Sequence, residues 1–544
     1  MIKPDLNEFL KLTKKGNLIP VYDEILGDLD TPVSAYYKLA DKNGYSFLLE
    51  SVEGEKKVAQ FSFLASHPEK VIRARGRTVD MIDLSTGKNR PTQIPAPDSP
   101  LKVIRDIMKE YSFVPIPGLP RFCGGLVGYL GYDMVRFFEH LPNQPDNDLN
   151  LPEMLLVLAK SLVIFDHLNH KIKVVYCVHV PERMNEKARI KAYSLAVKTI
   201  QDIIRKLHQP LKPEARGRGH SPRPPELRSN MSQERFEMIV KEAKKQIRAG
   251  EIIQVVLSQR FEMDMNVTPF NLYRMLRALN PSPYMYYLHF NGTAIVGSSP
   301  ELLIRCEDGV VETRPIAGTR PRGKDEQEDK KLAEDLLRDP KEIAEHIMLV
   351  DLGRNDLGRV CQKGTVAVSE FMAVEKYSHV MHIVSNVKGR LTPGKDSLDV
   401  LQAAFPAGTV SGAPKIRAME IIDSLENVAR GPYAGCIGYF SFSGNLDSCI
   451  TIRTIVAHQG KAYIQAGAGI VADSVPRREY QETMNKARAQ VLAIEQAHQI
   501  WSNGTTRPLN RKKANAAYKK EEGGKVHGST HSSAKSRSTS QQEV

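Results

Sequence analysis

Short apolar runs with strand-like spacing alternate with stretches of helical periodicity over the first 204 residues. A helix is predicted at 185–207, because its apolar residues recur every three or four positions from Ile190 to Ile203. The clearest strands are predicted at 45–52, 60–64 and 171–178. Both element types are therefore expected in this part of the chain.

A second series of elements begins with a capped helix. Ser232 is a suitable N-cap, apolar residues follow at helical spacing to Ile247, and Gly250 is expected to end the helix. Residues 252–257 predict a buried strand. From there to about residue 497, strands and helices alternate without the regular β-α-β period of a Rossmann or barrel fold.

Most of the positive charge lies outside these elements. Of the formal charge of +13, +5 falls in 205–229 and +6 in 503–544. The first segment is rich in Pro, Gly and Arg and predicts an exposed linker, whereas the second predicts a disordered tail. An RNA-binding arm is the alternative for the linker, but no aromatic residues interleave with its arginines. The predicted units are 1–204, a linker at 205–230, 231–500 and a tail at 501–544.

Composition and cysteine usage narrow the protein class. Hydrophobic residues make up 41% of the 544 residues, which is enough for a sizeable core. The six cysteines are dispersed without a C-x-x-C motif, as is typical of a reducing compartment. The N-terminus lacks signal-peptide character, and the longest apolar stretch, 154–165, is too short to cross a bilayer. We therefore expect a cytoplasmic protein without a membrane partner.

A helix predicted to start near residue 340 carries several carboxylates. Asp339 suits the N-cap, Pro340 the first helical position and Glu342 the third, as in a capping box. Negative charge is favoured at a helix N-terminus, which could by itself explain Glu342. Glu345 lies one turn deeper, beside the apolar run 347–350, and there a carboxylate requires a cation partner.

Another carboxylate-bearing helix is predicted to begin at Pro476. Glu479, Glu482 and Lys486 share one face of it. A surface pair between Glu482 and Lys486, worth about 0.3–0.5 kcal/mol, is the simplest interpretation. If this helix faces the helix of Glu345, one glutamate from each could hold Mg²⁺, which prefers one or two carboxylates completed by water and substrate oxygens.

Glycine-rich segments at 315–323, 405–415 and 465–470 are predicted to be turns whose backbone N–H groups can approach an anion. None matches a Walker A loop or a dinucleotide-binding motif, so nucleotide binding is not indicated. Together with Arg453, in the strand-like stretch 449–454, they predict a pocket for a small ligand with several negative charges. The residues alone thus indicate a Mg²⁺-assisted enzyme acting on a small carboxylated substrate.

Several ordered motifs resemble those of the chorismate-utilising enzymes and, within them, the large subunits (component I) of anthranilate synthases. The matching segments are 250–256, 298–301, 315–323, 345–351, 408–415 and 465–470. The resemblance covers roughly residues 15–500. It implies an α+β fold in which two β-sheets pack face to face, with helices outside and the active site in the cleft.

The resemblance also implies a set of site residues. Glu345 and Glu482 would bind Mg²⁺, which grips the ring carboxylate of chorismate. Glu301 would donate a proton to the departing C4 hydroxyl while ammonia adds at C2. The other implied residues are Gln254, His382 and Thr409 for catalysis, and Gly318, Thr319, Tyr433, Arg453, Gly467, Ala468, Gly469 and Lys486 for substrate binding. Without the resemblance, His382 would be interpreted as a core histidine and Thr409 as a loop threonine.

Two positions separate this chain from relatives with other products. Aminodeoxychorismate synthases often carry a nucleophilic lysine where this chain has Ala317, and isochorismate and salicylate synthases carry a water-activating lysine where it has Gln254. Neither alanine nor an amide can do this chemistry. The resemblance thus favours anthranilate formation for tryptophan biosynthesis, with aminodeoxychorismate synthase as the alternative.

A partner and an inhibitor are implied as well. No cysteine has the Gly-x-Cys-x-Gly surroundings of a glutaminase nucleophile, and Cys123 does not match, so ammonia would come from a glutamine amidotransferase subunit (component II) in a heterotetramer. Inhibition by L-tryptophan is implied at Ser51, Pro283, Tyr284 and Met285, which by chemistry alone are only a strand and a turn. A basic RNA-associated protein is the alternative of another class, but we expect no nucleic-acid partner.

Overall fold

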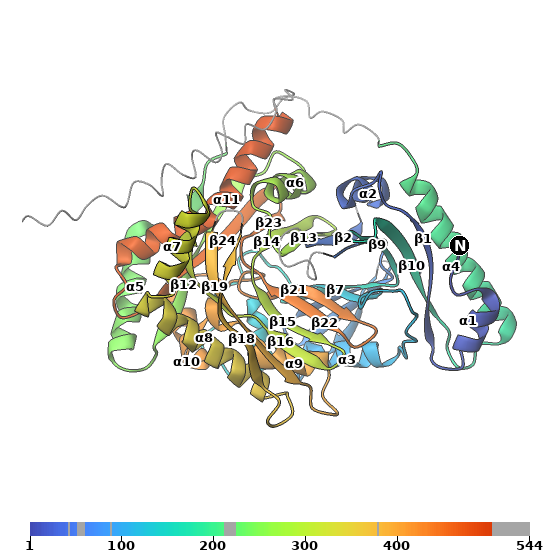
Figure 1. The fold of residues 1–544 in the computed structure, drawn as a ribbon, viewed down its shortest axis with the longest axis horizontal. Coiled ribbons are helices and arrows are strands. Elements are labelled where there is room, and N and C mark those ends of the chain that lie inside the picture. The colour runs from blue at the N-terminus through green and yellow to red at the C-terminus, as the bar shows by residue number, and fades with distance from the viewer. Residues whose placement is uncertain (42–43, 52–59, 88–89, 212–224, 378–379, 503–544) are drawn as a thin grey trace, which may run out of the picture.

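The computed structural model describes residues 1–41, 44–51, 60–87, 90–211, 225–377 and 380–502 (Figure 1). Half of the predicted linker (212–224) and nearly all of the predicted tail (503–544) lie outside the described residues. Two antiparallel β-sheets, each of twelve strands within these ranges, form the body of the molecule.

The first sheet joins strands from both halves of the chain. Its order is β1 (Leu18–Leu26), β10 (Lys171–His179), β9 (Ser161–Asp166), β3 (Phe61–Ser66), β2 (Tyr45–Glu50), β13 (Tyr284–Phe290), β14 (Thr293–Ser299), β23 (Thr454–His458), β24 (Lys461–Ile470), β12 (Gln254–Asp264) and β11 (Arg228–Ser229), with β20 (Gly412–Ala413) also on β12. The halves meet where β2 pairs with β13, with Leu48 opposite Tyr287.

The second sheet is built in the same way. Its order is β17 (Ile316–Pro321), β19 (Val380–Arg390), β16 (Val310–Thr313), β15 (Leu302–Glu307), β22 (Leu446–Ile450), β21 (Cys436–Ser441), β7 (Gly125–Leu130), β8 (Met154–Ala159), β4 (Lys70–Arg75), β5 (Thr78–Asp83) and β6 (Thr92–Pro95), with β18 (Ala367–Lys376) also on β19. Here the halves meet between β7 and β21.

Aromatic side chains fill the space between the two sheets. Phe63 of β3 contacts Tyr439 of β21, in the opposite sheet, with ring centroids 6.1 Å apart. Phe122 stacks on Tyr439 at 4.1 Å and meets Phe63 edge-on at 5.1 Å. These rings belong to a large buried cluster with members from both sheets. The predicted α+β architecture of two sheets packed face to face is therefore confirmed.

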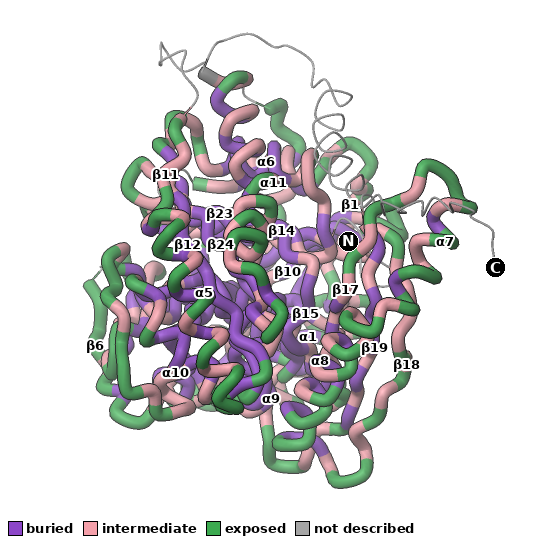
Figure 2. Tube along the Cα trace, turned by 90° about the vertical axis from the view of Figure 1, so that its left-hand side faces the viewer, coloured by how far each residue is buried: buried purple, intermediate pink, exposed green. Residues whose placement is uncertain are grey.

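Helices cover the outer faces of both sheets (Figures 1 and 2). Against the first sheet lie α1 (Leu6–Leu12), α2 (Pro32–Leu39), α4 (Glu186–Leu207), α5 (Gln233–Arg248), α6 (Pro269–Leu279), α10 (Lys415–Leu425) and α11 (Pro476–Ser502). The second sheet is accompanied by α3 (Pro100–Lys109), α7 (Glu326–Leu336), α8 (Pro340–Gly358) and α9 (Ser397–Ala404). The short 3₁₀ helices η1 (Tyr132–Phe137) and η2 (Gly408–Val410) complete the set among the described residues.

The predicted helix boundaries are largely confirmed. The helix predicted at 185–207 is α4, and the Ser232 side chain caps α5 by accepting a hydrogen bond from the Arg235 backbone. Asp339 caps α8, but the predicted capping box is incomplete, because the Glu342 carboxylate instead lies 3.8 Å from the guanidinium of Arg320.

Three other local predictions are wrong. Most of 315–323 forms β17 and all of 465–470 lies in β24, so these segments are strands rather than turns. Arg453 does not lie in a strand, because β22 ends at Ile450 and Arg453 has a φ of 53° in the turn before β23. Small residues signal close approach as well as chain reversal, and only the neighbouring chains decide between the two.

All six cysteines are buried and free. Within the described ranges, no helix combines the length and the hydropathy needed to cross a membrane.

The β2–β13 junction offers a test of the fold. Leu48 is fully buried at this junction, so Leu48→Ala is expected to lower the free energy of unfolding by about 2–5 kcal/mol through lost apolar contact and a residual cavity. Chemical denaturation followed by circular dichroism measures the loss. The control is Leu168→Ala, because Leu168 is 70% exposed and its truncation should change the stability by less than about 0.5 kcal/mol. If both substitutions lowered the free energy of unfolding equally, the burial of Leu48 at the β2–β13 junction would be contradicted.

Candidate active site

The predicted site residues converge from both sheets and from two outer helices. Lys486 of α11 donates from Nζ to the Gly467 carbonyl at 3.0 Å, and Arg453 donates from Nη1 to the Lys486 carbonyl at 2.6 Å. Arg453 in turn lies close enough to His382 of β19 to lower the pKa of that imidazole. The first sheet, the second sheet and α11 thus meet at one place.

Glu301 is a buried acid at this place. Burial raises the pKa of Glu301 to about 7, while Thr409 and Lys486 oppose this increase. Thr409 lies beside the carboxyl, yet its buried Oγ1 has no hydrogen-bond partner of good geometry among the described residues. A carboxylic acid that is partly protonated near neutral pH can donate a proton, and an unpartnered buried hydroxyl is suited to contact a ligand.

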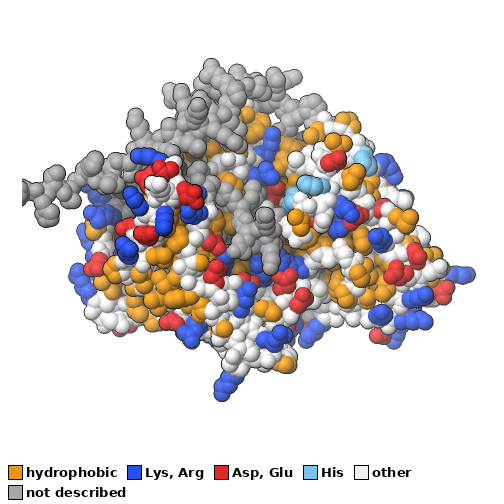
Figure 3. All heavy atoms as spheres, in the orientation of Figure 1, with side chains coloured by type: hydrophobic (Ala, Val, Ile, Leu, Met, Phe, Trp, Pro, Cys, Tyr) orange, Lys and Arg blue, Asp and Glu red, His pale blue; other side chains and the backbone are white. Residues whose placement is uncertain are grey.

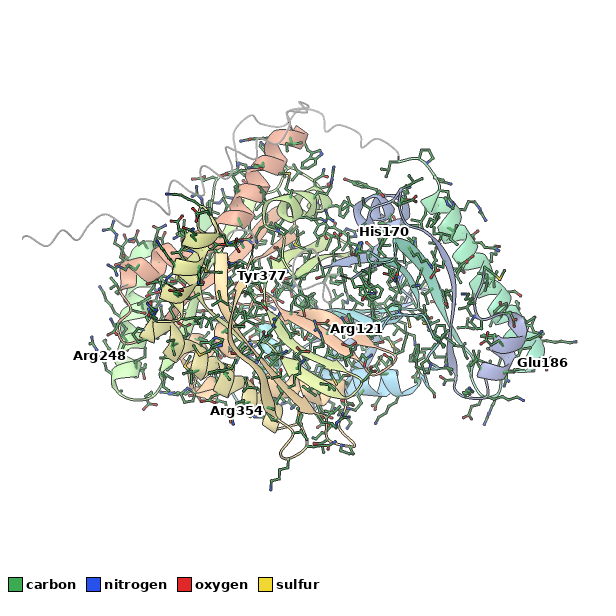
Figure 4. All side chains as sticks on the ribbon, in the orientation of Figure 1. Arg121, His170, Glu186, Arg248, Arg354 and Tyr377 are labelled. Carbon is green, nitrogen blue, oxygen red and sulfur yellow. The ribbon has the colours of Figure 1, made fainter. Side chains whose placement is uncertain are left out.

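His382 is held as a neutral imidazole. Its Nδ1 lies 2.8 Å from the Gly318 carbonyl and 3.2 Å from the Thr319 hydroxyl. Since a carbonyl only accepts, Nδ1 carries the proton and Nε2 keeps its lone pair. Burial lowers the pKa of His382. The ring also meets Tyr377, labelled in Figure 4, edge-on at 5.6 Å. His382 is thus oriented, uncharged and able to accept a proton at Nε2.

Small residues of β24 leave space for other side chains on one face of the first sheet. A Cβ atom at Gly467 would lie 2.7 Å from the Tyr433 hydroxyl, and one at Gly469 would lie 2.7 Å from the Gln254 side-chain nitrogen. Tyr433 and Gln254 can therefore lie flat over the strand only because glycines stand there. Ala468, between them, has its side chain in the core on the opposite face, so its backbone alone could face a ligand.

Carboxylates of α8 and α11 influence one another across the two helices. Burial raises the pKa of Glu345, Glu482 raises it further, and Lys341 and Lys486 lower it. Burial also raises the pKa of Glu342, and the negative charge of Glu345 raises it further. The pKa of Glu479 is also raised, first by burial and then by Glu482.

These carboxylates fit a magnesium ion. Within the described ranges, no three His, Cys, Asp or Glu side chains converge as a complete metal cage. Mg²⁺ does not require one, because one or two carboxylates with water and substrate oxygens fill its octahedron. Lys486 lies beside these carboxylates, with Nζ 2.6 Å from the Glu482 carboxylate. Partly buried carboxylates that destabilise one another would gain from a cation, so Glu345 and Glu482 suit the ligand role.

Charged side chains also hold the helix that follows β17. Acidic and basic groups are interspersed over α7 (Figure 3). Arg320 donates to Asp335 at 2.7 Å and to Asp339 at 2.9 Å, and Arg322 donates to Asp329 at 2.6 Å. This network fastens α7 and the start of α8 to β17, the strand that carries Gly318 and Thr319.

Two of the four residues predicted for tryptophan, Ser51 and Tyr284, lie side by side. Glu50, the last residue of β2, pairs with Met285 of β13, so Ser51 continues beside Tyr284. The buried Ser51 hydroxyl has no hydrogen-bond partner within the part of the chain that the structure describes. Tyr284 donates its hydroxyl to Asp447 at 2.9 Å. The side chain of Met285 instead belongs to the core against the helices.

Two residues beside the site escaped the sequence analysis. Arg430 and Glu426 form a buried ion pair directly under Tyr433. Their spacing of four residues is the only sequence signal, and it is common in exposed helices. Burial, which makes the pair unusual, is not visible in the sequence.

Comparison with known proteins places this geometry in a family. A family model described as chorismate binding enzyme matches residues 44–491. Anthranilate synthase component 1 of Acetivibrio thermocellus is 49% identical over 505 residues, covering 92% of this chain and 100% of the relative. The corresponding protein of Thermus thermophilus is 47% identical over 483 residues, covering 88% and 98%.

Solved structures of related enzymes have a similar fold. Anthranilate synthase component I from Streptococcus pneumoniae TIGR4 superposes with a TM-score of 0.70 at 38% identity, over 86% of this chain and 99% of that one. The menaquinone-specific isochorismate synthase of Escherichia coli shares the fold at 20% identity, with a TM-score of 0.63 over 90% and 98% of the two chains. The chain belongs to the chorismate-binding enzyme family.

Proposed function

We propose that this chain is the large subunit of an anthranilate synthase, which converts chorismate and ammonia to anthranilate, pyruvate and water as the entry step of tryptophan biosynthesis. The observation that carries the proposal is the close similarity, over nearly the whole chain, to proteins named anthranilate synthase component 1. The site supports it, because Ala317 and Gln254 are unsuited to the lysine chemistry expected of the other products.

Chorismate is a dianion, and the site offers matched donors. Arg453 and Lys486 supply positive charge, and the Tyr433 hydroxyl lies over Gly467, where the backbone can be approached closely. Glu345 and Glu482 would hold Mg²⁺, which when bound neutralises and orients the ring carboxylate. Gly318, Thr319, Gly467 and Gly469 would complete the substrate contacts through small or short side chains.

Glu301 would act as the general acid. Ammonia adds at C2, the ring double bonds shift, and the C4–O bond breaks. The departing hydroxyl takes the Glu301 proton and leaves as water. Pyruvate is then eliminated with loss of the C2 proton, which aromatises the ring. His382, neutral with Nε2 free to accept a proton, and Thr409, beside Glu301, are the groups best placed to assist.

The remaining assignments complete the proposal. A separate glutamine amidotransferase subunit, as the name component 1 implies, would supply ammonia in a heterotetramer. L-Tryptophan would inhibit by binding at Ser51 and 283–285. We place the enzyme in the cytoplasm.

Direct assay tests the function. The purified chain with chorismate, ammonium and Mg²⁺ is expected to form anthranilate, detected by its fluorescence, and L-tryptophan is expected to inhibit the reaction. Chelation of Mg²⁺ should abolish product formation and added Mg²⁺ should restore it. A product that becomes aromatic only after a separate lyase is added would instead indicate aminodeoxychorismate synthase, and insensitivity to tryptophan would refute the inhibitor site.

The role of Glu301 predicts a pH dependence. Its acid form is required, so at a constant concentration of free ammonia the rate should fall as the pH rises through the Glu301 pKa of about 7. Glu301→Gln should lower kcat by about 10²–10⁴-fold, since the amide cannot donate the proton. Steady-state kinetics between pH 6 and 9 provide the measurement. A Glu301→Gln enzyme with unchanged kcat would exclude the role.

The metal site predicts a different response. Glu482→Gln should raise the Mg²⁺ concentration required for half-maximal activity at least about 10-fold, with a matching loss of affinity in titration calorimetry. The control is Glu334→Gln on α7, whose carboxylate lies 3.9 Å from Arg338 at the surface. If Glu482→Gln and the control bind Mg²⁺ equally well, Glu482 is only the surface partner of Lys486.

A further inference from the structure

A fully buried ion pair lies behind the candidate active site. Arg430 donates from Nη2 to Glu426 Oε1 at 2.6 Å and from Nε to Oε2 at 2.9 Å. The two side chains are only 2% and 3% exposed. Both residues lie in the segment between α10 and β21, so helix geometry does not hold them together.

The Arg430 guanidinium joins separate pieces of the chain. It donates from Nη1 to the Val410 carbonyl and from Nη2 to the Val256 carbonyl, each at 2.7 Å. It also lies over the rings of Tyr132 and Tyr433, 4.7 Å and 5.6 Å from their centroids. Hydrogen bonds to the planar fork and contacts with both aromatic rings fix its orientation.

Glu426 extends the same network. Its Oε1 accepts from the Ser258 backbone at 2.8 Å and from the Ser258 hydroxyl at 2.9 Å. The Ser258 hydroxyl in turn accepts from the Gln465 amide at 2.9 Å. The pair thus reaches β12 and β24, the two strands that carry Gln254, Gly467 and Gly469.

Each segment that Arg430 holds carries a candidate substrate contact. Val410 follows Thr409, whose hydroxyl lies beside Glu301. Val256 pairs with Gly469 across β12 and β24. Tyr433 is contacted directly, and its hydroxyl lies over Gly467. The Arg430 side chain therefore contacts the loop of Thr409, the residue paired with Gly469 of β24, and Tyr433.

Stability does not account for such a pair. Removing two charges from water is costly, and replacing a buried ion pair with apolar residues of similar volume is often neutral or stabilising. Removing one partner is different, because it leaves an uncompensated buried charge. The stability of the pair and its effect on the site can therefore be separated by experiment.

We propose that Arg430 and Glu426 are positioning residues for the reaction at this site, which set the separation of Thr409, Gly469 and Tyr433 without touching the substrate. This inference rests on the proposed function, because its readout is anthranilate formation. Misplacement of reacting groups by about 1 Å can cost about 10²-fold in rate, so loss of the pair should lower kcat in protein that remains folded.

The decisive variant replaces both charges. Arg430→Met with Glu426→Leu should keep a melting temperature near that of the wild type and a wild-type far-ultraviolet circular dichroism spectrum. Its kcat per folded molecule, with ammonium as the nitrogen source, should fall about 100-fold, by more than KM rises. A purely structural pair predicts a kcat per folded molecule equal to that of the wild type, and that result would overturn the proposal.

A remote pair provides the matched control. Lys38 and Asp30, on and before α2, form a 2.7 Å ion pair with side chains 12% and 16% exposed. Lys38→Met with Asp30→Leu also exchanges charge for apolar surface, at a helix that packs against β2 and β3 rather than against β12 and β24. Its kcat should remain within about threefold of the wild type, and a loss equal to that of the Arg430 double variant would overturn the proposal.

A conservative variant covers failure of the double variant to fold. Arg430→Lys keeps the charge but cannot form the planar fork, so it cannot reach Glu426, Val256 and Val410 in the same geometry. We expect a folded enzyme with kcat reduced about 10-fold or more; wild-type kcat and KM would overturn the proposal. If the wild-type chain itself makes no anthranilate, the proposed function is refuted. The positioning role is then refuted for anthranilate formation.

Discussion

The structure depends on strand pairing between distant parts of the chain. β2 pairs with β13 and β7 pairs with β21, so each sheet joins strands from residues 18–179 to strands from residues 228–470. Backbone groups at these junctions are buried and must be hydrogen-bonded, which makes each half of a sheet incomplete without the other. Packing of the two sheets through rings such as Phe63 and Tyr439 then fixes their separation, and the site lies where both sheets and α11 meet.

Burial determines the electrostatics of that site. It raises the pKa values of Glu301, Glu342, Glu345 and Glu479 and lowers that of His382. Burial therefore favours an acid that is partly protonated near pH 7, carboxylates that gain from a nearby cation, and an imidazole that is neutral. Nearby lysines and arginines oppose the increase only in part for the carboxyl groups, whereas Arg453 lowers the pKa of His382 further.

Backbone and side-chain size determine the shape of the site. Gly467 and Gly469 alternate on one face of β24 and leave room for Tyr433 and Gln254, whereas Ala468 fills the core on the other face. Behind Tyr433, Arg430 ties the loop of Thr409 to β12. The glycines leave one face of β24 open, and the hydrogen bonds of Arg430 hold the segments behind that face in place. The shape of the site therefore depends on both.

The sequence by itself determined the elements, the family motifs and the residue types of the site. Local rules suffice for these, since the caps at Ser232 and Asp339 and the period of α4 depend on neighbours a few positions away. Periodicity could not distinguish a glycine-rich turn from the open strand at 465–470, because the distinction depends on which chain lies alongside. Tertiary structure alone decided that Glu345 and Glu482 approach each other from two helices and that Arg430 and Glu426 are buried. Depth in the molecule and contacts between distant segments arise only when the two sheets close on each other.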